Sequence, residues 1–254
     1  MDLFFNKKLA ETYHSASQRA RVLTESWVVE NMFCPRCGNL HLSHFGNNRP
    51  VADFYCSFCK NEYELKSKTG PLDKKVNDGA YYTMIERITG NKNPDFFFMN
   101  YSKENQCVKD FIVIPKHFFV PDIIEKRKPL SETARRAGWV GCNILIGKVP
   151  QQGRIEVIKN GKIAEIDEIV KKVNRGKALE IPDIKERTWL MDVLFCINQA
   201  PTEFSLAKIY EYTHYLSSKH PKNNNIQAKI RQQMQILRDL GFIEFLGKGK
   251  YRKV

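Results

Sequence analysis

Residues 34–66 read CPRCGNLHLSHFGNNRPVADFYCSFCKNEYELK, and this stretch carries most of the chemical information in the 254-residue sequence. It contains two Cys-x-x-Cys pairs, formed by Cys34 with Cys37 and by Cys56 with Cys59. One aspartate lies between the pairs, and the triplet Glu-Leu-Lys at residues 64–66 follows directly after them. Four thiols and a group of carboxylates with a lysine are therefore encoded side by side.

The cysteine spacing predicts a structural zinc site. Four thiolates in the pattern Cys-x2-Cys-x18-Cys-x2-Cys complete a tetrahedral Zn²⁺ shell and leave no open coordination position. His41 and His44 could each replace a cysteine, but the four cysteines, Cys34, Cys37, Cys56 and Cys59, already fill the shell. The alternative is a set of unbound buried thiols. The other three of the seven cysteines lie in apolar segments and are expected to be buried small side chains: Cys107, Cys142 and Cys196.

The acidic residues and the lysine predict a second site that handles phosphodiester chemistry. Glu64 and Lys66 are two residues apart on a predicted strand, so both side chains point to one face while Tyr63 and Leu65 point into the core. Asp53, beside the preceding strand, could reach the same divalent metal as Glu64. Lys66 could orient or deprotonate the attacking water and offset charge in the transition state. The alternative is an exposed strand face with Asp53 in an ordinary turn.

The pattern of apolar segments predicts an α/β core. Short apolar runs, rich in aromatic or β-branched residues, read as strands, and helical patterns alternate with them. The expected helices are 7–32, 77–89 (capped by Asn77 or Asp78 and ended by Gly90) and 161–175. The expected strands are 51–55, 63–65, 96–99, 111–114, 140–146 and 154–158. Periodicity is lost between residues 176 and 184, so we expect a domain boundary there, giving domains 1–182 and 183–254 with a cysteine module at 34–59.

Residues 183–254 predict a winged helix. Three helical patterns are followed by two short strands around Gly247-Lys248-Gly249, with Ser205 as the cap of the second helix and Gly241 as the end of the third. Nine Lys or Arg residues and two acids lie between residues 219 and 254. The third helix of such a domain enters the major groove, and the wing contacts phosphates. The expected DNA-binding residues are Lys222, Asn223, Asn224, Asn225, Gln227, Lys229, Arg231, Lys248, Lys250, Arg252 and Lys253. A winged helix used for protein contacts is the alternative.

Charge and hydropathy restrict the partners. The formal net charge is +13, from 41 Lys and Arg against 28 Asp and Glu, which favours a polyanionic partner such as nucleic acid. No run of eighteen apolar residues is present, and the N-terminus lacks the features of a signal peptide. We therefore expect no membrane span and a cytoplasmic location.

The order strand, carboxylate, strand with Glu-x-Lys, flanked by helices, resembles the PD-(D/E)xK nuclease superfamily. Asp53 and the Glu64–Lys66 strand carry this resemblance, although Ala52 stands where the motif has proline. The resemblance implies a mixed sheet with flanking helices, Mg²⁺ held by Asp53, Glu64 and the Leu65 backbone carbonyl, and catalysis by Asp53, Glu64 and Lys66. A further acid from the first helix, Glu25 or Glu30, could join the site.

With the cysteine module and the winged helix added, the whole chain is similar to methyl-directed type II restriction endonucleases. Phe33–Gly38 and Tyr55–Lys66 carry most of this similarity. It implies Mg²⁺-dependent cleavage of double-stranded DNA at GATC sites that contain N6-methyladenine. Trp139, in an Arg-Arg-Ala-Gly-Trp loop, is a candidate wall of a methyl-base pocket or else a core tryptophan.

Two other functions remain open from the sequence. One is a zinc-ribbon and winged-helix regulator that binds DNA without cutting it, and the other is a repair nuclease of different specificity. The sequence also leaves open whether one chain cuts both strands or two chains meet on the duplex; a monomer in solution is the working hypothesis.

Overall fold

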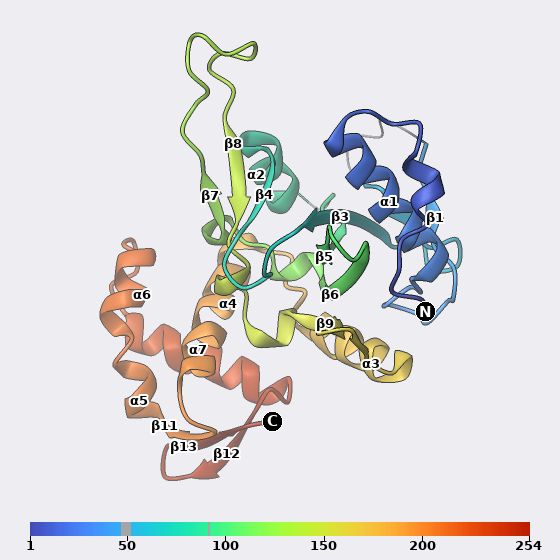
Figure 1. The fold of residues 1–254 in the computed structure, drawn as a ribbon. Coiled ribbons are helices and arrows are strands. Elements are labelled where there is room, and N and C mark those ends of the chain that lie inside the picture. The colour runs from blue at the N-terminus through green and yellow to red at the C-terminus, as the bar shows by residue number, and fades with distance from the viewer. Residues whose placement is uncertain (47–51, 91) are drawn as a thin grey trace. The chain divides into compact units, whose positions relative to one another are not determined.

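The computed structural model describes residues 1–46, 52–90 and 92–254, and divides them into two compact units, Met1–Lys177 and Ala178–Val254 (Figure 1). The domain boundary expected between residues 182 and 183 stays a prediction, since compactness alone does not define a folding domain. No helix in the described ranges combines the length and hydropathy that crossing a membrane requires.

A seven-stranded mixed sheet forms the centre of the first unit, which confirms the predicted α/β class. Its spatial order is β1-β2-β3-β5-β6-β9-β10, with β3 and β5 parallel and the other neighbours antiparallel. The strands are β1 (Ser43–His44), β2 (Phe54–Tyr55), β3 (Glu62–Lys68), β5 (Asp95–Ser102), β6 (Cys107–Ile114), β9 (Ile155–Lys159) and β10 (Lys162–Ile163). A three-stranded sheet accompanies it, in the order β4 (Val76–Ala80), β8 (Gly141–Ile144) and β7 (Ile124–Lys126).

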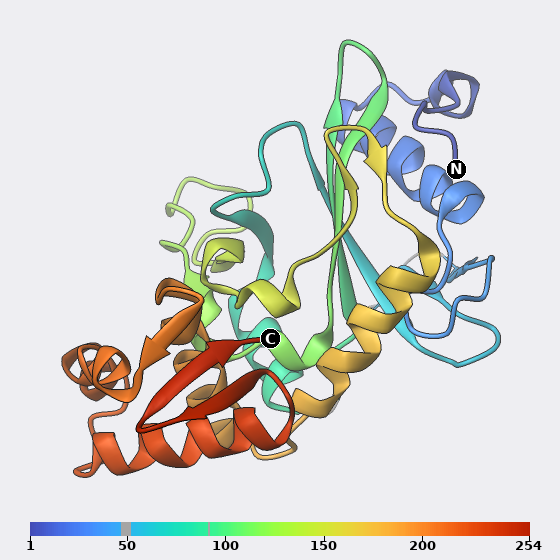
Figure 2. The same cartoon turned by 90° about the horizontal axis from the view of Figure 1, so that it is seen from below.

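Helices cover both faces of the central sheet. On one face lie α1 (Ala16–Asn31) and α3 (Ile166–Gly176), and Figure 2 shows them on the same side of the strands. Trp27 and Val173 from these helices join Phe97 and Phe111 in one buried cluster. On the opposite face Phe96 packs on Phe119, and α2 (Tyr81–Thr89) places a guanidinium over the Phe96 ring. Because successive strand residues alternate between faces, β5 can be buried on both sides.

Short 3-10 turns complete the first unit. They are Lys7–Ala10, Lys116–Phe118, Pro121–Ile123, Ile146–Lys148 and Gln151–Gly153, and a further 3-10 turn, Lys177–Leu179, runs from the last residue of the first unit into the second.

Three predicted helices of the first unit were wrong in their extent. The helix expected at 7–32 is a 3-10 turn (Lys7–Ala10) followed by α1, because Ser15 has an extended backbone and Thr, Tyr and His before it are weak helix formers. The helix expected at 161–175 begins only at Ile166, after the short strand β10. The strand expected at 51–55 is observed as β2, and Val51 lies outside the described residues.

The third error concerns residues 76–80, which form strand β4 rather than the start of a helix. Asn77 and Asp78 therefore do not cap α2, whose cap position is Ala80, although Gly90 does follow its last residue as predicted. Asn, Asp and Gly have low helix propensity, and pairing of β4 with β8 supplies the hydrogen bonds that a helix would have made.

The second unit contains helices and a small sheet in the predicted order. The helices are α4 (Ile184–Gln199), α5 (Leu206–Tyr210), α6 (Thr213–Lys219) and α7 (Ile226–Asp239). The strands lie in the order β11 (Glu203–Ser205), β13 (Lys250–Lys253) and β12 (Ile243–Gly247). Ser205 caps α5 by accepting from the Lys208 N–H, and Gly241 has φ +74° just beyond α7, as predicted. The single second helix that we expected is two helices, and β11 was not predicted.

Candidate active site and metal centre

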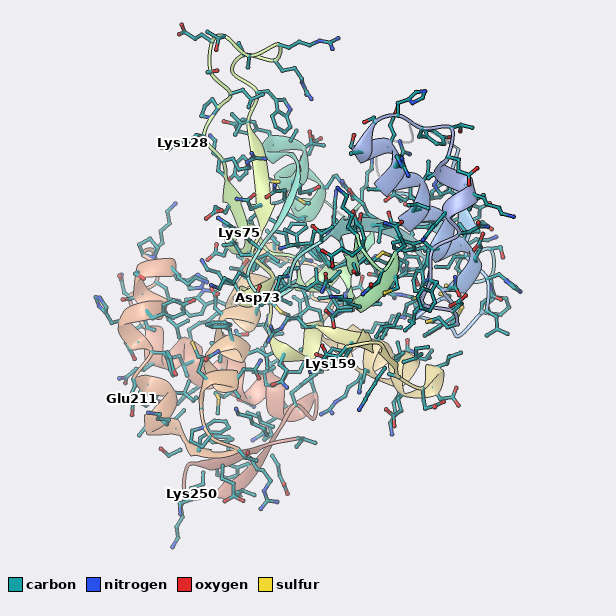
Figure 3. The ribbon with its side chains drawn as sticks, in the orientation of Figure 1. Asp73, Lys75, Lys128, Lys159, Glu211 and Lys250 are labelled. Atoms are coloured by element: carbon teal, nitrogen blue, oxygen red, sulfur yellow. The ribbon has the colours of Figure 1, made fainter. Side chains whose placement is uncertain are left out.

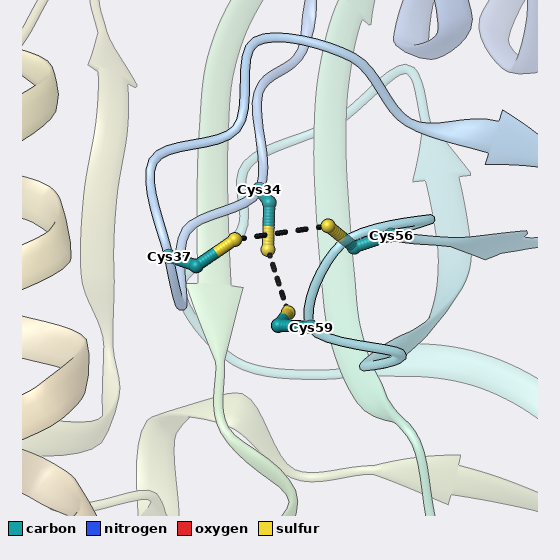
Figure 4. Close-up of side chains that lie close together, drawn as sticks. All are labelled: Cys34, Cys37, Cys56 and Cys59. Carbon is teal, nitrogen blue, oxygen red and sulfur yellow. Dashed lines mark hydrogen bonds between the residues drawn. The ribbon is translucent and has the colours of Figure 1, made fainter.

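The four cysteines Cys34, Cys37, Cys56 and Cys59, called here the cysteine cluster, meet at one point (Figure 4). Their sulfur atoms all lie within 4.8 Å of one another, with 3.5 Å between Cys34 and Cys59 and 3.7 Å between Cys37 and Cys56. These separations are too long for disulfides. They match the edge of about 3.8 Å of a sulfur tetrahedron with Zn–S bonds of about 2.3 Å.

Two loops of the same design present the sulfur atoms, Cys34–Asn39 and Cys56–Asn61. In each, the N–H of the fifth residue donates to the carbonyl of the first, at 2.8 and 2.9 Å, and the N–H of the first donates to the carbonyl of the sixth, at 2.7 and 2.9 Å. The fifth residues, Gly38 and Lys60, have left-handed backbones with φ of 77° and 61°. The two halves of the cluster are thus matched turns that each direct two sulfur atoms inward.

The surroundings of the sulfur atoms shift the pKa values of the thiols in opposite directions. Burial raises the pKa of the Cys34 and Cys59 thiols. At Cys56 burial also acts to raise the pKa, but the backbone N–H groups of Cys59 and Phe58 outweigh it and lower the pKa to about 7. A thiol that ionises near neutrality is ready to bind a metal. The donor set therefore fits Zn²⁺, and the histidine alternatives are not needed, because His44 pairs instead with Glu25 at 3.1 Å.

A buried carboxylate ties both loops to the central sheet. Asp95, at the start of β5, accepts from the Asn61 side chain at 2.8 Å and from the Lys116 backbone N–H at 2.8 Å, and Arg36 lies 3.6 Å away. The hydroxyl of Tyr63, on β3, lies 3.0 Å from the Cys34 sulfur. The cysteine cluster is therefore anchored to the two parallel strands next to which the second site lies.

The three residues predicted to be catalytic line one cavity of about 380 Å³ beside α1 and β3. We call this cavity, lined by Asp53, Glu64, Lys66 and Glu25, the carboxylate cleft. The Leu65 N–H donates to Asp53 Oδ2 at 2.7 Å, and Lys66 Nζ donates to Glu64 Oε1 at 2.5 Å. The sequence-predicted side chains are thus brought together.

Strand β3 presents these side chains by simple alternation. Tyr63 is fully buried and stacks on Phe97, with ring centroids 4.5 Å apart, and Leu65 packs against the same core. Glu64 and Lys66 point to the opposite face. The predicted assignment of the two faces agrees with the packing.

Each carboxylate of the cleft changes the proton affinity of its neighbours. Burial and the negative charges of Glu64 and Glu25 raise the pKa of Asp53, although the Leu65 N–H opposes them. Burial acts to lower the pKa of Lys66, but the carboxylates of Glu64 and Asp78 outweigh it and raise that pKa above its ordinary value. Lys66 is therefore an ammonium ion in this arrangement, suited to orient water or offset negative charge.

Two residues that sequence reasoning missed complete this group. Asp78, on β4, forms an ion pair with Lys66, and Arg87, on α2, donates to Glu64 Oε2 at 2.5 Å. Their side chains are only 4% and 12% exposed, which marks them as part of the interior of the site. The sequence carries only a weak signal for them, since Asp78 reads as a possible helix cap.

Glu25 and Glu30, the two acids of the first helix that the sequence left open, differ in their position relative to the carboxylate cleft. Glu25 lines the carboxylate cleft and pairs with Arg21 at 2.7 Å, and both Glu25 and Glu30 line a neighbouring cavity. Of the two acids left open, Glu25 therefore stands beside Asp53. Its role in chemistry stays a prediction.

The carboxylate cleft also offers the donors that Mg²⁺ prefers. Asp53 and Glu64 supply carboxylate oxygens, and the backbone of Leu65 supplies a carbonyl. Both oxygens of Glu64 already accept from cations, Lys66 and Arg87, so a bound metal would share this carboxylate with them. The donor chemistry fits a hard divalent cation.

In the second unit, the predicted DNA-binding residues fall into two groups. Some are held by partners within the unit: Lys229 donates to both oxygens of Glu186 at 2.7 and 2.8 Å, Arg252 pairs with Glu203, and Lys253 donates to backbone carbonyls at the end of α4. Arg231 donates to the Tyr210 hydroxyl at 2.8 Å while staying exposed. The exposed residues at the start of α7 and on the wing are Lys222, Asn224, Asn225, Gln227, Lys248 and Lys250, the last of which is labelled in Figure 3.

Two protein-family models match this chain, and they divide it close to the boundary between the two compact units. Residues 1–181 match the family model described as DpnI, the Dam-replacing family, and residues 185–253 match the Dam-replacing HTH domain. The chain belongs to the Dam-replacing family.

Membership of this family supports a methylation-dependent restriction endonuclease that acts on DNA. It confirms the resemblance inferred from the motifs, and the matched HTH domain confirms the DNA-binding architecture of the second unit. A restriction nuclease also calls for a divalent metal, in agreement with the donors of the carboxylate cleft.

Trp139 lies in the long segment between β7 and β8, which Figure 1 shows extending away from α2. Arg136 lies 4.7 Å above the Trp139 ring, and the ring covers Gly141, where a Cβ would come within 2.8 Å of it. Trp139 is half-buried rather than part of the core, and the same segment carries the basic residues Arg127, Lys128 (labelled in Figure 3), Arg135 and Arg136. Of the three other cysteines, Cys142 and Cys196 are buried as predicted, while Cys107 is only half-buried.

Proposed function

We propose that this protein is a type II restriction endonuclease. It hydrolyses phosphodiester bonds of double-stranded DNA at GATC sites that contain N6-methyladenine, in a Mg²⁺-dependent reaction. The proposed setting is the cytoplasm, with a monomer in solution. The observation that supports the chemistry is the convergence of Asp53, Glu64 and Lys66 in one cleft of a chain that belongs to the Dam-replacing family.

The roles follow from the donor chemistry of the cleft. Asp53, Glu64 and the Leu65 carbonyl would hold Mg²⁺, which would lower the pKa of water and neutralise phosphate charge. Lys66, held at 2.5 Å from Glu64, orients the attacking water and offsets the negative charge that develops on the phosphate. Strand β3 carries Glu64 and Lys66, and the Leu65 N–H donates to Asp53, so the fold itself positions these groups.

The cysteine cluster has a structural role in this proposal. Zn²⁺ bound by its four thiolates joins the loops on either side of Asp53, and Asp95 connects both loops to β5. Asp53 is therefore carried on a segment that the metal restrains. A catalytic role would need an open coordination position, which four thiolates do not leave.

A methyl requirement demands more than one contact. Burying a methyl group stabilises a complex by about 1 kcal/mol, which corresponds to about a fivefold preference. Strict discrimination therefore requires that both the first unit and the winged helix respond to the methyl group, so that their preferences multiply, or that methyl contact is coupled to closure of the site. Trp139 is the aromatic candidate for the methyl contact in the first unit.

Digestion of matched plasmids tests the proposal. Plasmid from an adenine-methylating host and from a non-methylating host is incubated with the protein and Mg²⁺ or with EDTA, and the cut ends are sequenced. We expect cleavage of the methylated plasmid alone, only with Mg²⁺, at GATC, and no cleavage by Asp53→Asn. Equal cleavage of both plasmids would indicate a repair nuclease, and binding without cleavage would indicate a regulator.

A further inference from the structure

Lys66 is held by two carboxylates, those of Glu64 and Asp78. The Lys66 ammonium donates to Glu64 Oε1 at 2.5 Å and forms a second ion pair with Asp78 Oδ1. The Asp78 side chain is 4% exposed, so this pair is shielded from solvent. Arg87 in turn binds the other oxygen of Glu64, which makes a group of two acids and two bases with no net charge.

Asp78, the partner of Lys66, lies next to an irregularity in β4. Strand β4 pairs with β8 in antiparallel register, and this register shifts between Asp78 and Ala80, around Gly79. Such a bulge redirects the side chain next to it and is frequent beside functional sites. A Cβ added to Gly79 would meet no atom of the described residues within 4 Å, so close packing does not explain the irregularity.

A second carboxylate is needed because a lysine side chain is long and mobile. Its four-carbon stem loses conformational entropy of about 2 kcal/mol when it is fixed, and one ion pair does little to fix it. Glu64 alone would be a poor anchor, since a divalent cation sharing that carboxylate weakens its attraction for the ammonium. Asp78 is not one of the proposed metal ligands, so its attraction for Lys66 is not weakened in this way.

We propose that Asp78 is a positioning residue for the cleavage reaction, which keeps the Lys66 ammonium directed at the scissile phosphate when Glu64 holds the metal. This inference rests on the proposed function, because it assigns Lys66 its role there. In this proposal Asp78 acts only through Lys66. Its removal should therefore slow the chemical step and leave DNA binding and the fold in place.

The test compares Asp78→Asn with the wild type and with Asp73→Asn. Asparagine keeps the size of the side chain and removes its charge, while Asp73, labelled in Figure 3, loses the same charge at an exposed position just before β4. Single-turnover cleavage of a methylated duplex, the Kd for that duplex in EDTA, and the melting temperature are measured for each protein. We expect Asp78→Asn to cleave about 100-fold more slowly, with a Kd within about threefold of the wild type. Asp73→Asn should match the wild type in all three.

A second variant separates positioning from folding. Asp78→Glu restores the carboxylate and should recover most of the single-turnover rate, which a purely structural role of Asp78 would not predict. Cleavage by Asp78→Asn at the wild-type rate overturns the inference and leaves the proposed function intact. A variant that loses binding and thermal stability together with activity, without recovery in Asp78→Glu, also overturns it, because Asp78 would then be a fold determinant. Failure of the wild type to cut methylated DNA removes the proposed function itself.

Discussion

The cysteine cluster and the carboxylate cleft share one stretch of chain, yet only the cluster is complete within it. All four thiols lie between residues 34 and 59, and each loop forms its own hydrogen bonds. The cleft takes Asp53, Glu64 and Lys66 from the same stretch, but Glu25 from α1 also lines it, and Asp78 from β4 and Arg87 from α2 pair with its charged side chains.

This difference separates two ways of encoding a site. Short spacing determines which atoms meet in the cluster, because a tight turn allows few arrangements of its two sulfur atoms. In the cleft, the partner of each charge is determined by how β3 and β4 are brought together in the folded unit. We therefore expect the loss of one thiol to disrupt the whole cluster. The loss of one charged side chain in the cleft should remove only the role of that side chain.

Removal of one thiol should have the largest effect of any single change. Cys56→Ser should lose bound zinc and the cooperative unfolding of the first unit, because structural zinc contributes about 10–16 kcal/mol of apparent binding free energy to such folds. Metal content by mass spectrometry under native conditions and thermal unfolding by circular dichroism measure both. Cys107→Ser, at a half-buried cysteine outside the cluster, is the control and should keep its metal. Retention of zinc in Cys56→Ser would contradict the assignment of the cluster.

Lys66→Ala should have the second-largest effect, and it should reduce cleavage without reducing DNA binding. We expect cleavage to fall at least about 1,000-fold, while specific DNA binding stays nearly intact because the winged helix supplies it. The melting temperature should fall as well, since Glu64 and Asp78 lose the ammonium that compensates both. Gel-shift titration and single-turnover cleavage provide the two readouts. Lys75→Ala removes an exposed lysine and should change neither.

A parallel loss of binding and cleavage in Lys66→Ala would make that lysine a DNA contact. The comparison between the two sites would then weaken, because the cleft would also contribute to recognition.

The core strands and the meeting of the four thiols could be predicted from the sequence, because local patterns encode both. The apolar runs at 96–99 and 111–114 appear inside β5 and β6, and the thiols meet as their spacing predicts. Sequence reasoning missed the strand β4 because Asn77-Asp78-Gly79 reads equally as a helix start, and only pairing with β8, more than sixty residues away, decides between the two. Asp78 was missed for the same reason: its partner Lys66 is reached through the fold and not through spacing.

Arg231→Ala tests the recognition side and should have a moderate effect. Arg231 is exposed on α7 and its guanidinium is oriented by the Tyr210 hydroxyl at 2.8 Å. Loss of one base or phosphate contact should weaken binding by about 1–3 kcal/mol, and cleavage of DNA that is already bound should slow less. Arg238→Ala, in the last turn of α7, is the matched control. A larger loss in bound-state cleavage than in affinity would place Arg231 in the reaction instead.

We expect the smallest effects from substitutions that compare the backbones of the two cysteine loops, Cys34–Asn39 and Cys56–Asn61. Gly38 and Lys60 occupy equivalent positions with φ of 77° and 61°, but only lysine bears the strain of a left-handed backbone, about 1–2 kcal/mol. Lys60→Gly relieves that strain and adds flexibility to the unfolded chain, so we expect the free energy of unfolding to stay within about 0.5 kcal/mol of the wild type.

Gly38→Ala is the opposite change and should cost about 1 kcal/mol in the same urea titration. A Cβ there would lie 3.8 Å from Val170, an ordinary contact, so the loss would come from backbone strain alone. Equal losses in the two variants would mean that the loops differ in more than this residue. A clear difference would show that the first loop, with glycine at the left-handed position, is the better adapted of the two turns.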